Sequence, residues 1–437
     1  MEWYLIFIVI FSGLVVLMLT GMPVAFCFML INVGGMYFFF GGLVGLENLI
    51  DSIYTSLNTF ILLPIPLFIL MGEIMFHSGI APVLIETIDK WMGRLPGRLS
   101  LLSVAAGTLF SALTGTSLAS VALLGSSLTP EMEKRGYKKS MSLGPILGSG
   151  GLAMMIPPSA LAVLCGAIAE VSIGRLLIAI ILPGLLMAVI YAAYIIIRCK
   201  LQPSIAPDYE VTPVSFSQKV VATIKYVLPQ GVVIFLVVGV IFIGIATPSE
   251  AAATGAIGTI IIAACYGRIN WNVLSKSIKG TLTVTSMIFL ILASATAFSQ
   301  ILAFSGATAG LTNLAKGVSI APILIIIIMQ IVVFFLGGFL DVVSIMMVSL
   351  PIFVPIVRSI GLDPIWFSVL FLINIEVAGI SPPFGMSLFI MRGVAPEGTT
   401  MMDIYMAAIP FVGLSILAMV IIMFFPAMAL WLPNLMF

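Results

Sequence analysis

Two stretches of the chain combine residue types that suit the binding of a cation inside a membrane. Glycine and serine precede a Pro-Pro pair in each, over residues 148–159 and 378–385. Proline removes a backbone donor and clashes with the preceding turn, while glycine favours unwinding, so neither stretch fits an unbroken helix. Both lie in apolar segments long enough to cross a bilayer. Backbone groups freed at such depth are tolerated only in buried or wet sites, where transporters hold cations and substrates.

Two further interruptions carry hydroxyl groups, glycines and one carboxylate. They divide the apolar segments 98–135 and 320–358. A desolvated Na⁺ needs several neutral or singly charged oxygens, which backbone carbonyls and hydroxyls supply. We predict one sodium site built from Thr114, Gly115, Thr116, Ser117, Gly148, Ser149, Gly150 and Pro157. A second, pseudo-symmetric sodium site would use Gly337, Gly338, Asp341, Ala378, Gly379, Ser381 and Pro382. In the competing interpretation, the glycines only allow helices to approach and the prolines only kink them.

Acidic residues near these interruptions are candidates for coupling. Asp341 lies at a predicted hairpin turn, where a carboxylate is costly unless it meets a cation, a donor or water. It could bind a cation or substrate, and it could also cap the helix that follows. Glu376 lies one turn before the second break and could carry a proton or support neighbouring ligands. For an anionic substrate we expect contacts from Thr116, Ser117, Ser120, Ser159, Asp341 and Phe384.

The composition is that of a polytopic membrane protein. Of 437 residues, 61% are hydrophobic and 8% charged, against about 25% charged in soluble domains, and the mean hydropathy is +1.27. Apolar runs recur at lengths that let a helix cross about 30 Å of hydrocarbon, so we expect an all-α fold. A single histidine excludes bis-histidine haem bundles and makes a zinc protease implausible, and the spacing of the four cysteines argues against a disulfide framework or a metal knuckle. No nucleophile elbow, Walker or HExxH motif is present, so we expect no enzyme.

Basic residues set the predicted topology. If 98–135 and 320–358 are re-entrant hairpins, 15 of the 18 Lys and Arg fall on the cytoplasmic side and only Arg175, Lys316 and Arg358 fall outside. This predicts about eleven transmembrane helices plus two hairpins, with both termini periplasmic. The competing interpretation of 98–135 is a plain helical hairpin whose loop reaches the far surface.

An internal repeat accompanies this topology. An offset of 225 residues relates Pro130 to Pro355, Gly136 to Gly361 and the Pro157-Pro158 pair to Pro382-Pro383. We expect N-terminal scaffold spans over 1–51, a first repeat over 52–199, a linker with connecting spans over 200–279, and a second repeat over 280–437. The broken helices would cover 140–170 and 364–392. The hairpins open to opposite sides, which is the inverted-repeat architecture of secondary carriers.

The chain resembles the large membrane subunit of the tripartite ATP-independent periplasmic (TRAP) transporters over essentially its whole length. The resemblance rests on Gly115-Thr116-Ser117, Ile156-Pro157-Pro158-Ser159, Gly337-Gly338-Phe339-Leu340-Asp341 and Ser381-Pro382-Pro383-Phe384-Gly385. It implies an elevator mechanism driven by Na⁺ in a bacterial inner membrane. It also implies a small four-helix membrane subunit, a periplasmic substrate-binding protein and an organic acid such as a C4-dicarboxylate or a sialic acid. Because the chain begins at its first span, we expect the small subunit to be a separate polypeptide.

Other functions stay open at this point. A free-standing Na⁺- or H⁺-coupled dicarboxylate carrier of similar architecture would need no binding protein. A membrane-embedded enzyme or redox subunit would need a nucleophile with its base, or axial ligands, and one histidine with scattered cysteines argues against both. A channel is compatible with the composition, but inverted repeats with paired hairpins favour alternating access.

Overall fold

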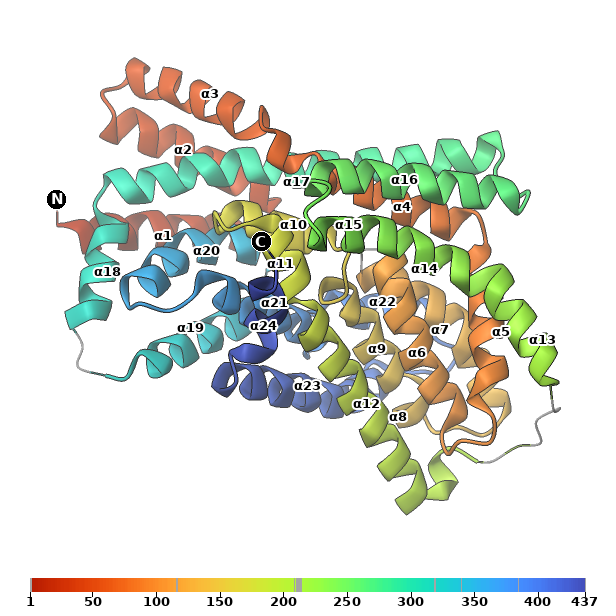
Figure 1. Cartoon of the computed structure of the whole chain (residues 1–437). Coiled ribbons are helices and arrows are strands. Elements are labelled where there is room, and N and C mark those ends of the chain that lie inside the picture. The colour runs from red at the N-terminus through yellow and green to blue at the C-terminus, as the bar shows by residue number, and fades with distance from the viewer. Residues whose placement is uncertain are drawn as a thin grey trace.

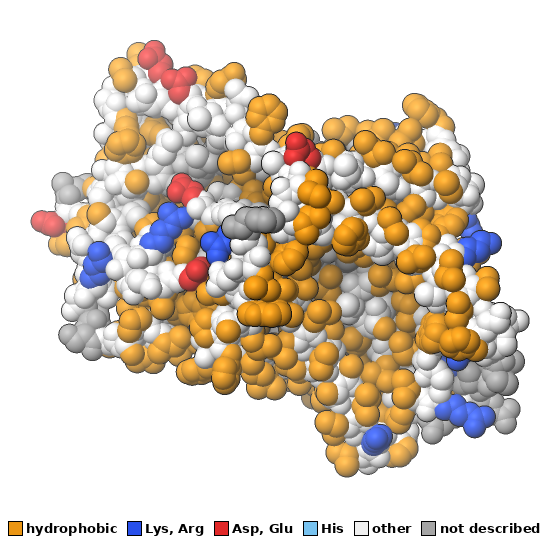
Figure 2. All heavy atoms as spheres, in the orientation of Figure 1, with side chains coloured by type: hydrophobic (Ala, Val, Ile, Leu, Met, Phe, Trp, Pro, Cys, Tyr) orange, Lys and Arg blue, Asp and Glu red, His pale blue; other side chains and the backbone are white. Residues whose placement is uncertain are grey.

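The computed structural model describes residues 2–114, 117–207, 209, 214–317, 320–338, 340–383 and 385–436, with the backbone alone for 112–114. Every regular element in these ranges is helical (Figure 1). Seven helical stretches are long and apolar enough to cross a membrane, and five shorter apolar helices accompany them. Hydrophobic side chains cover most of the face seen in Figure 2, with few charged groups among them. The expected polytopic all-α protein is confirmed at this level.

Long helices near the N-terminus and in the middle of the chain pack together as a scaffold. They are α1 (Trp3–Leu19), α2 (Val24–Phe39), α3 (Leu43–Leu57), α4 (Pro64–His77), α16 (Pro248–Cys265) and α17 (Trp271–Phe304). The 34-residue α17 packs on α2, α3 and α4, and α4 packs on α16 (Figure 1). Thr247 and Glu250 form the capping box that begins α16. α13 (Phe216–Ala222), α14 (Leu228–Ile234) and α15 (Val240–Phe242) are joined by π-helical turns into one path beside α16.

Two helix pairs occupy the segments predicted as hairpins. The first consists of α6 (Arg98–Thr114) and α7 (Ser117–Lys134), and the second of α19 (Pro322–Leu336) and α20 (Val342–Ser359). The arms of each pair pack on one another. The two pairs lie toward opposite ends of the molecule in Figure 1. Their bounds agree with the predicted ranges 98–135 and 320–358.

Both predicted helix breaks are present. α9 (Gly144–Gly151) ends in a 3₁₀ turn, and α10 (Ala160–Ile168) resumes after the Pro157-Pro158 pair. α21 (Pro364–Ile380) ends before the Pro382-Pro383 pair, and α22 (Met386–Val394) resumes after it. Both Pro-Pro peptide bonds are cis. Ser159 caps α10 by accepting a hydrogen bond from the Ala162 N–H at 3.2 Å.

The order of elements is the same in the two halves. A long helix, a short helix, a helix pair, a broken helix and a final span run as α4, α5 (Ile80–Met92), α6–α7, α9–α10 and α12 (Ile181–Leu201), then as α17, α18 (Ala307–Gly317), α19–α20, α21–α22 and α23 (Met401–Phe424). Matching glycines end the second arms of the two pairs: Gly136 has φ +76° and Gly361 has φ +79°. This left-handed conformation disfavours any residue with a Cβ, which accounts for the repeated glycine.

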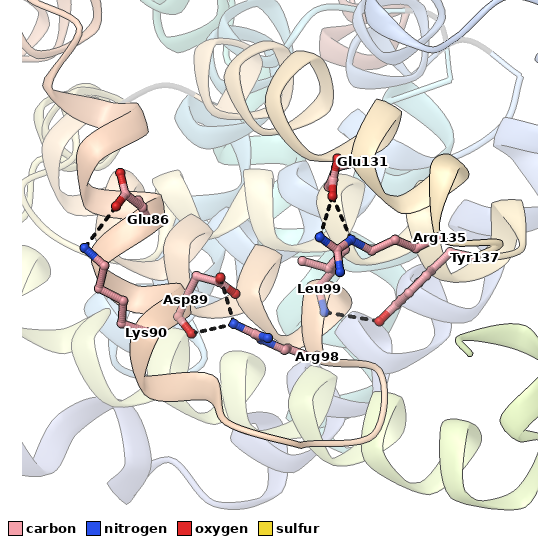
Figure 3. A network of polar contacts seen from close by, with 8 residues as sticks. All are labelled: Glu86, Asp89, Lys90, Arg98, Leu99, Glu131, Arg135 and Tyr137. Atoms are coloured by element: carbon pink, nitrogen blue, oxygen red, sulfur yellow. Dashed lines mark hydrogen bonds and ion pairs between the residues drawn. The ribbon is translucent and has the colours of Figure 1, made fainter. Parts of the chain in front are cut away.

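One ion pair ties the start of the first helix pair to α5, and a second lies at the end of α7 (Figure 3). The Arg98 guanidinium donates to the Asp89 carboxylate at 2.8 Å and to the Asp89 carbonyl at 3.0 Å. Arg135 pairs with Glu131 at 2.6 Å and lies over the Tyr209 ring at 3.6 Å from its centroid. Burial raises the pKa of the Asp89 carboxyl, and the Arg98 charge opposes that shift. α5 and α6 are thereby tied at their shared turn.

We predict that Gly361→Ala destabilises the protein by about 1 kcal/mol, because alanine must enter the left-handed region. Open space surrounds Gly361, so the loss reflects the backbone alone. Thermal unfolding in detergent measures it. Gly393→Ala in α22 is the matched control, since Gly393 also has open space but no positive φ. Equal melting temperatures for the two variants would contradict the prediction.

Candidate functional site

One cavity of about 470 Å³ lies where both helix pairs and both breaks meet the scaffold, and we call it the central cavity. Ser117 begins α7 and Asp341 precedes α20, so each helix pair contributes its turn. Met154 comes from the first break, and Gly379 adjoins the second. The scaffold wall is apolar and comes from α2, α4 and α17. Segments distant in sequence therefore enclose a single volume.

Asp341 caps α20 and lines the central cavity at once. Its Oδ1 accepts hydrogen bonds from the N–H groups of Val343 at 3.0 Å and Ser344 at 3.1 Å, and its Oδ2 accepts one from the Ser344 hydroxyl. The capping interpretation of this residue is thus confirmed. Such a cap contributes about 1 kcal/mol, and the carboxylate still faces the cavity with its negative charge.

Glu376 is the most unusual group in the site. Its side chain is 1% exposed, and neither carboxylate oxygen has a hydrogen-bond partner among the described residues. A β-carbon built on Gly151 would lie 0.9 Å from its Oε1, so the carboxyl group fills space that only glycine leaves at the end of α9. A buried carboxylate without a partner is costly. The carboxyl ends of α9 and α21 add partial negative charge nearby, which favours a cation there.

Both arms of the first helix pair are in close contact with α9, and glycines allow that packing. A β-carbon on Gly150 would lie 2.3 Å from a Val121 methyl of α7, and one on Gly107 would lie 2.6 Å from Ser149. Gly148 faces Phe411 of α23 in the same way. These contacts match the interpretation in which small residues let helices approach. They also bring the backbone of α9 beside α6 and α7.

The second turn and second break pack in a related way. A β-carbon on Gly337 would lie 2.1 Å from that of Ala378, so the end of α19 abuts the end of α21. The Asn374 amide donates to the carbonyl of Gln330 at 2.6 Å and to its side-chain oxygen at 2.7 Å, which ties α21 to α19. Neither polar residue was foreseen. A buried amide in an apolar run is the signal that could have found them.

The predicted site residues fall into three groups. Ser117, Asp341, Gly379 and Glu376 line the central cavity. A second group lies at the turns and breaks beside it without lining it: Ser120, Gly148, Ser149, Gly150, Pro157, Ser159, Gly337, Gly338, Ala378, Ser381 and Pro382. Gly115, Thr116 and Phe384 lie outside the described residues, and Thr114 is described only as the last residue of α6.

Paired interrupted helices around one membrane-buried cavity are the arrangement found in secondary transporters. The chain belongs to the DctM component family of the tripartite ATP-independent periplasmic transporters, whose family model matches residues 11–428.

Several transport proteins are similar in sequence to this chain over almost its whole length. The ectoine TRAP transporter large permease protein TeaC of Halomonas elongata is 30% identical, with 96% of this chain and 97% of the relative covered. The C4-dicarboxylate TRAP transporter large permease protein DctM of Pseudomonas aeruginosa is 30% identical, with 89% and 90% covered. The isethionate TRAP transporter permease protein DctMQ of Oleidesulfovibrio alaskensis is 27% identical, with 90% of this chain and 61% of the relative covered.

Solved structures of similar fold come from more distant proteins. The Alcanivorax borkumensis YdaH transporter superposes with a TM-score of 0.60 at 14% identity, covering 87% of this chain and 88% of that one. Neisseria gonorrhoeae MtrF superposes with a TM-score of 0.63 at 13% identity, covering 89% and 84%. At such identity the similarity concerns the fold alone.

Family membership determines the general activity. The protein is a multi-pass transporter permease and not an enzyme. It works as a secondary transporter with a periplasmic binding protein and a small membrane subunit as its partners. The expected tripartite class is therefore confirmed over the free-standing carrier, while the substrate names of the relatives differ from one to the next.

We predict that Gly151→Ala disrupts the site, because its methyl group would overlap the Glu376 carboxyl. The expected destabilisation is about 1–3 kcal/mol, measured by thermal unfolding. In a Glu376→Ala background the same substitution should cost much less, since the overlapping atoms are gone. Gly231→Ala in α14, where nothing lies within 4 Å, is the control. An unchanged cost in the double variant would show that the two residues are not in contact.

Proposed function

We propose that this chain is the large subunit of a Na⁺-coupled importer of organic acids in a bacterial inner membrane. The observation that carries the proposal is the meeting of both turns, both breaks and the unpartnered Glu376 carboxylate at the central cavity. Helix carboxyl ends and carboxylates favour small cations, whereas helix amino ends favour an anionic substrate. Both kinds of helix end occur at the two breaks.

The proposed Na⁺ sites keep the predicted composition. The first would use the turn at Ser117 with the backbone of the first break, and the second would use Asp341 with the backbone around Gly379. Glu376 would balance cation charge between them, because its carboxylate lies at the end of α9 and one turn before the end of α21.

The proposed mechanism is an elevator. The two helix pairs and the broken helices would move as one body against the scaffold wall of α2, α4 and α17. Each helix pair would enter the membrane and leave it on the same side, and the two pairs would do so from opposite sides because the repeats are inverted.

The number of membrane crossings follows from the position of the termini. If both termini are periplasmic, the number of full crossings must be even, so the expected eleven does not fit. The helices offer an even set of such paths: α1, α2, α4, α9–α10, α12, α13–α15, α16, α17, α21–α22 and α23.

The proposed substrate is an organic acid, a C4-dicarboxylate first and a sialic acid second. The binding protein would deliver it, and a separate small subunit would complete the membrane complex. Uptake into proteoliposomes that hold both membrane subunits tests this proposal. Accumulation of a labelled organic acid should need the binding protein and an inward Na⁺ gradient. Accumulation of free substrate without the binding protein, or under a proton gradient alone, would refute it.

We predict that Asp341→Asn reduces Na⁺-driven uptake at least tenfold while leaving thermal stability within about 0.5 kcal/mol. Asparagine keeps the helix cap, since Asn and Asp cap equally well, but it removes the charge that faces the cavity. Asp363→Asn is the matched control, because Asp363 caps α21 by accepting from the Ile365 N–H at 2.7 Å and does not line the cavity. Normal uptake in Asp341→Asn would remove this carboxylate from coupling.

We predict that Glu376→Gln raises the Na⁺ concentration for half-maximal uptake by about tenfold or more, because a neutral amide attracts a cation far less than a carboxylate. The side chain keeps its size, so the contact with Gly151 is preserved. Uptake measured over a series of Na⁺ concentrations tests it. An unchanged half-maximal concentration would mean that Glu376 does not attract the coupling cation.

A further inference from the structure

A second cavity, of about 370 Å³, lies along the interface that forms the central cavity, and we call it the outer cavity. α10, α17 and α20 each line both cavities. Residues of α17 between 284 and 291 line the central cavity, and residues between 292 and 303 line the outer cavity. On α20 the lining runs from Asp341 to Arg358, a rise of about 25 Å. The two cavities therefore follow one another along these three helices, between the scaffold and the second helix pair, and we call this path the track.

The outer cavity is lined with hydroxyl groups that the central cavity lacks on its scaffold wall. Those groups belong to Ser56, Thr59, Thr296, Ser299 and Thr308. Thr296 and Ser299 lie one turn apart on α17 and donate to carbonyls of their own helix, each at 3.0 Å. A hydroxyl hydrogen can rotate toward a better acceptor. This wall can therefore donate to an anion that passes along it.

Arg358 supplies the positive charge. Among the described residues that line the outer cavity, it is the only cationic one. Its Nη2 donates to the carbonyls of Ala169 at 3.1 Å and Glu170 at 2.8 Å, which fixes the guanidinium at the end of α10. Glu170 also lines the outer cavity, and its carboxylate lies 4.0 Å from Nη1 and is 82% exposed, so the ion pair that it forms with Arg358 is weak. Further N–H donors of the guanidinium are left for an anion.

We propose that the outer cavity is the vestibule through which the anionic group of the substrate, a carboxylate or sulfonate, enters, and that Arg358 attracts it. This inference rests on the proposed function, which supplies an anion moving between the outside and the central cavity. The track is positive at Arg358 and negative at Asp341. An anion is thus held at the outer end until a cation neutralises the Asp341 carboxylate.

Charge-selective labelling tests the vestibule directly. Ser299→Cys is introduced in a Cys265→Ser background, because the other native cysteines are buried. Two membrane-impermeant thiol reagents, sulfonatoethyl and trimethylammonioethyl methanethiosulfonate, are applied from the outside of right-side-out vesicles. Their rates are normalised to a free thiol. The anionic-to-cationic ratio should be about fivefold higher with Arg358 than with Arg358→Gln, the size expected for one charge several ångströms away in water.

Two control variants distinguish the effect of the Arg358 charge from a structural effect of replacing Arg358. Arg358→Lys should keep most of the ratio, although lysine cannot reproduce the fork that bridges two carbonyls. Arg175→Gln should leave the labelling ratio unchanged, because Arg175 donates a hydrogen bond to Asn434 and does not line the outer cavity. Equal ratios in the wild-type and Gln backgrounds, or no labelling of Ser299→Cys from outside, would overturn the proposal.

Uptake gives a second readout. Arg358→Gln should lower kcat/KM for the organic acid severalfold and Arg358→Lys should restore it. A loss that lysine leaves uncorrected, with an unchanged labelling ratio, would assign Arg358 a purely structural role and refute the vestibule. The labelling does not depend on transport. A complex that fails to take up any organic acid contradicts the proposed function, whereas unselective labelling in an active complex contradicts this inference alone.

Discussion

The whole architecture depends on the absence of water in the hydrocarbon core of a bilayer. A backbone group freed from its helix there must find a partner inside the protein or face a wet cavity. The chain frees such groups at two breaks and two turns, and all four come together around one volume. The scaffold helices close its remaining side with apolar residues. The functional site is therefore the place where the cost of interrupted helices is offset, and the rest of the fold shields it.

Local chemistry explains why so much of this was predictable. Each Pro-Pro pair ends a helix, so both breaks lie within a few residues of where the sequence placed them, although Gly148 and Gly150 stay inside α9. The offset of 225 residues likewise related Gly136 to Gly361, and both adopt the left-handed turn. The capping function of Asp341 followed from its residue type alone. Each of these features is encoded within a few neighbouring residues.

Tertiary contacts account for what could not be predicted. The contact of Glu376 with Gly151 joins residues more than two hundred positions apart, and only the packing of α21 on α9 brings them together. Most predicted sodium ligands lie beside the central cavity without lining it, since Gly148 and Gly150 face Phe411 and Val121. The same glycine pattern suits ion binding and close packing. Side-chain neighbours on other helices decide between the two, and a single sequence does not contain them.

α17 is longer than the hydrocarbon core of a bilayer is thick, and it lines both cavities. Its 34 residues extend about 51 Å, well beyond the hydrocarbon thickness of about 30 Å. One continuous helix therefore forms a wall of both cavities beside the second helix pair. Side chains on neighbouring helices interlock, so if the second helix pair slides along α17 as proposed, it would move in steps of about one helical turn, or 5.4 Å. A transport cycle on this fold would pass through a short series of discrete registers.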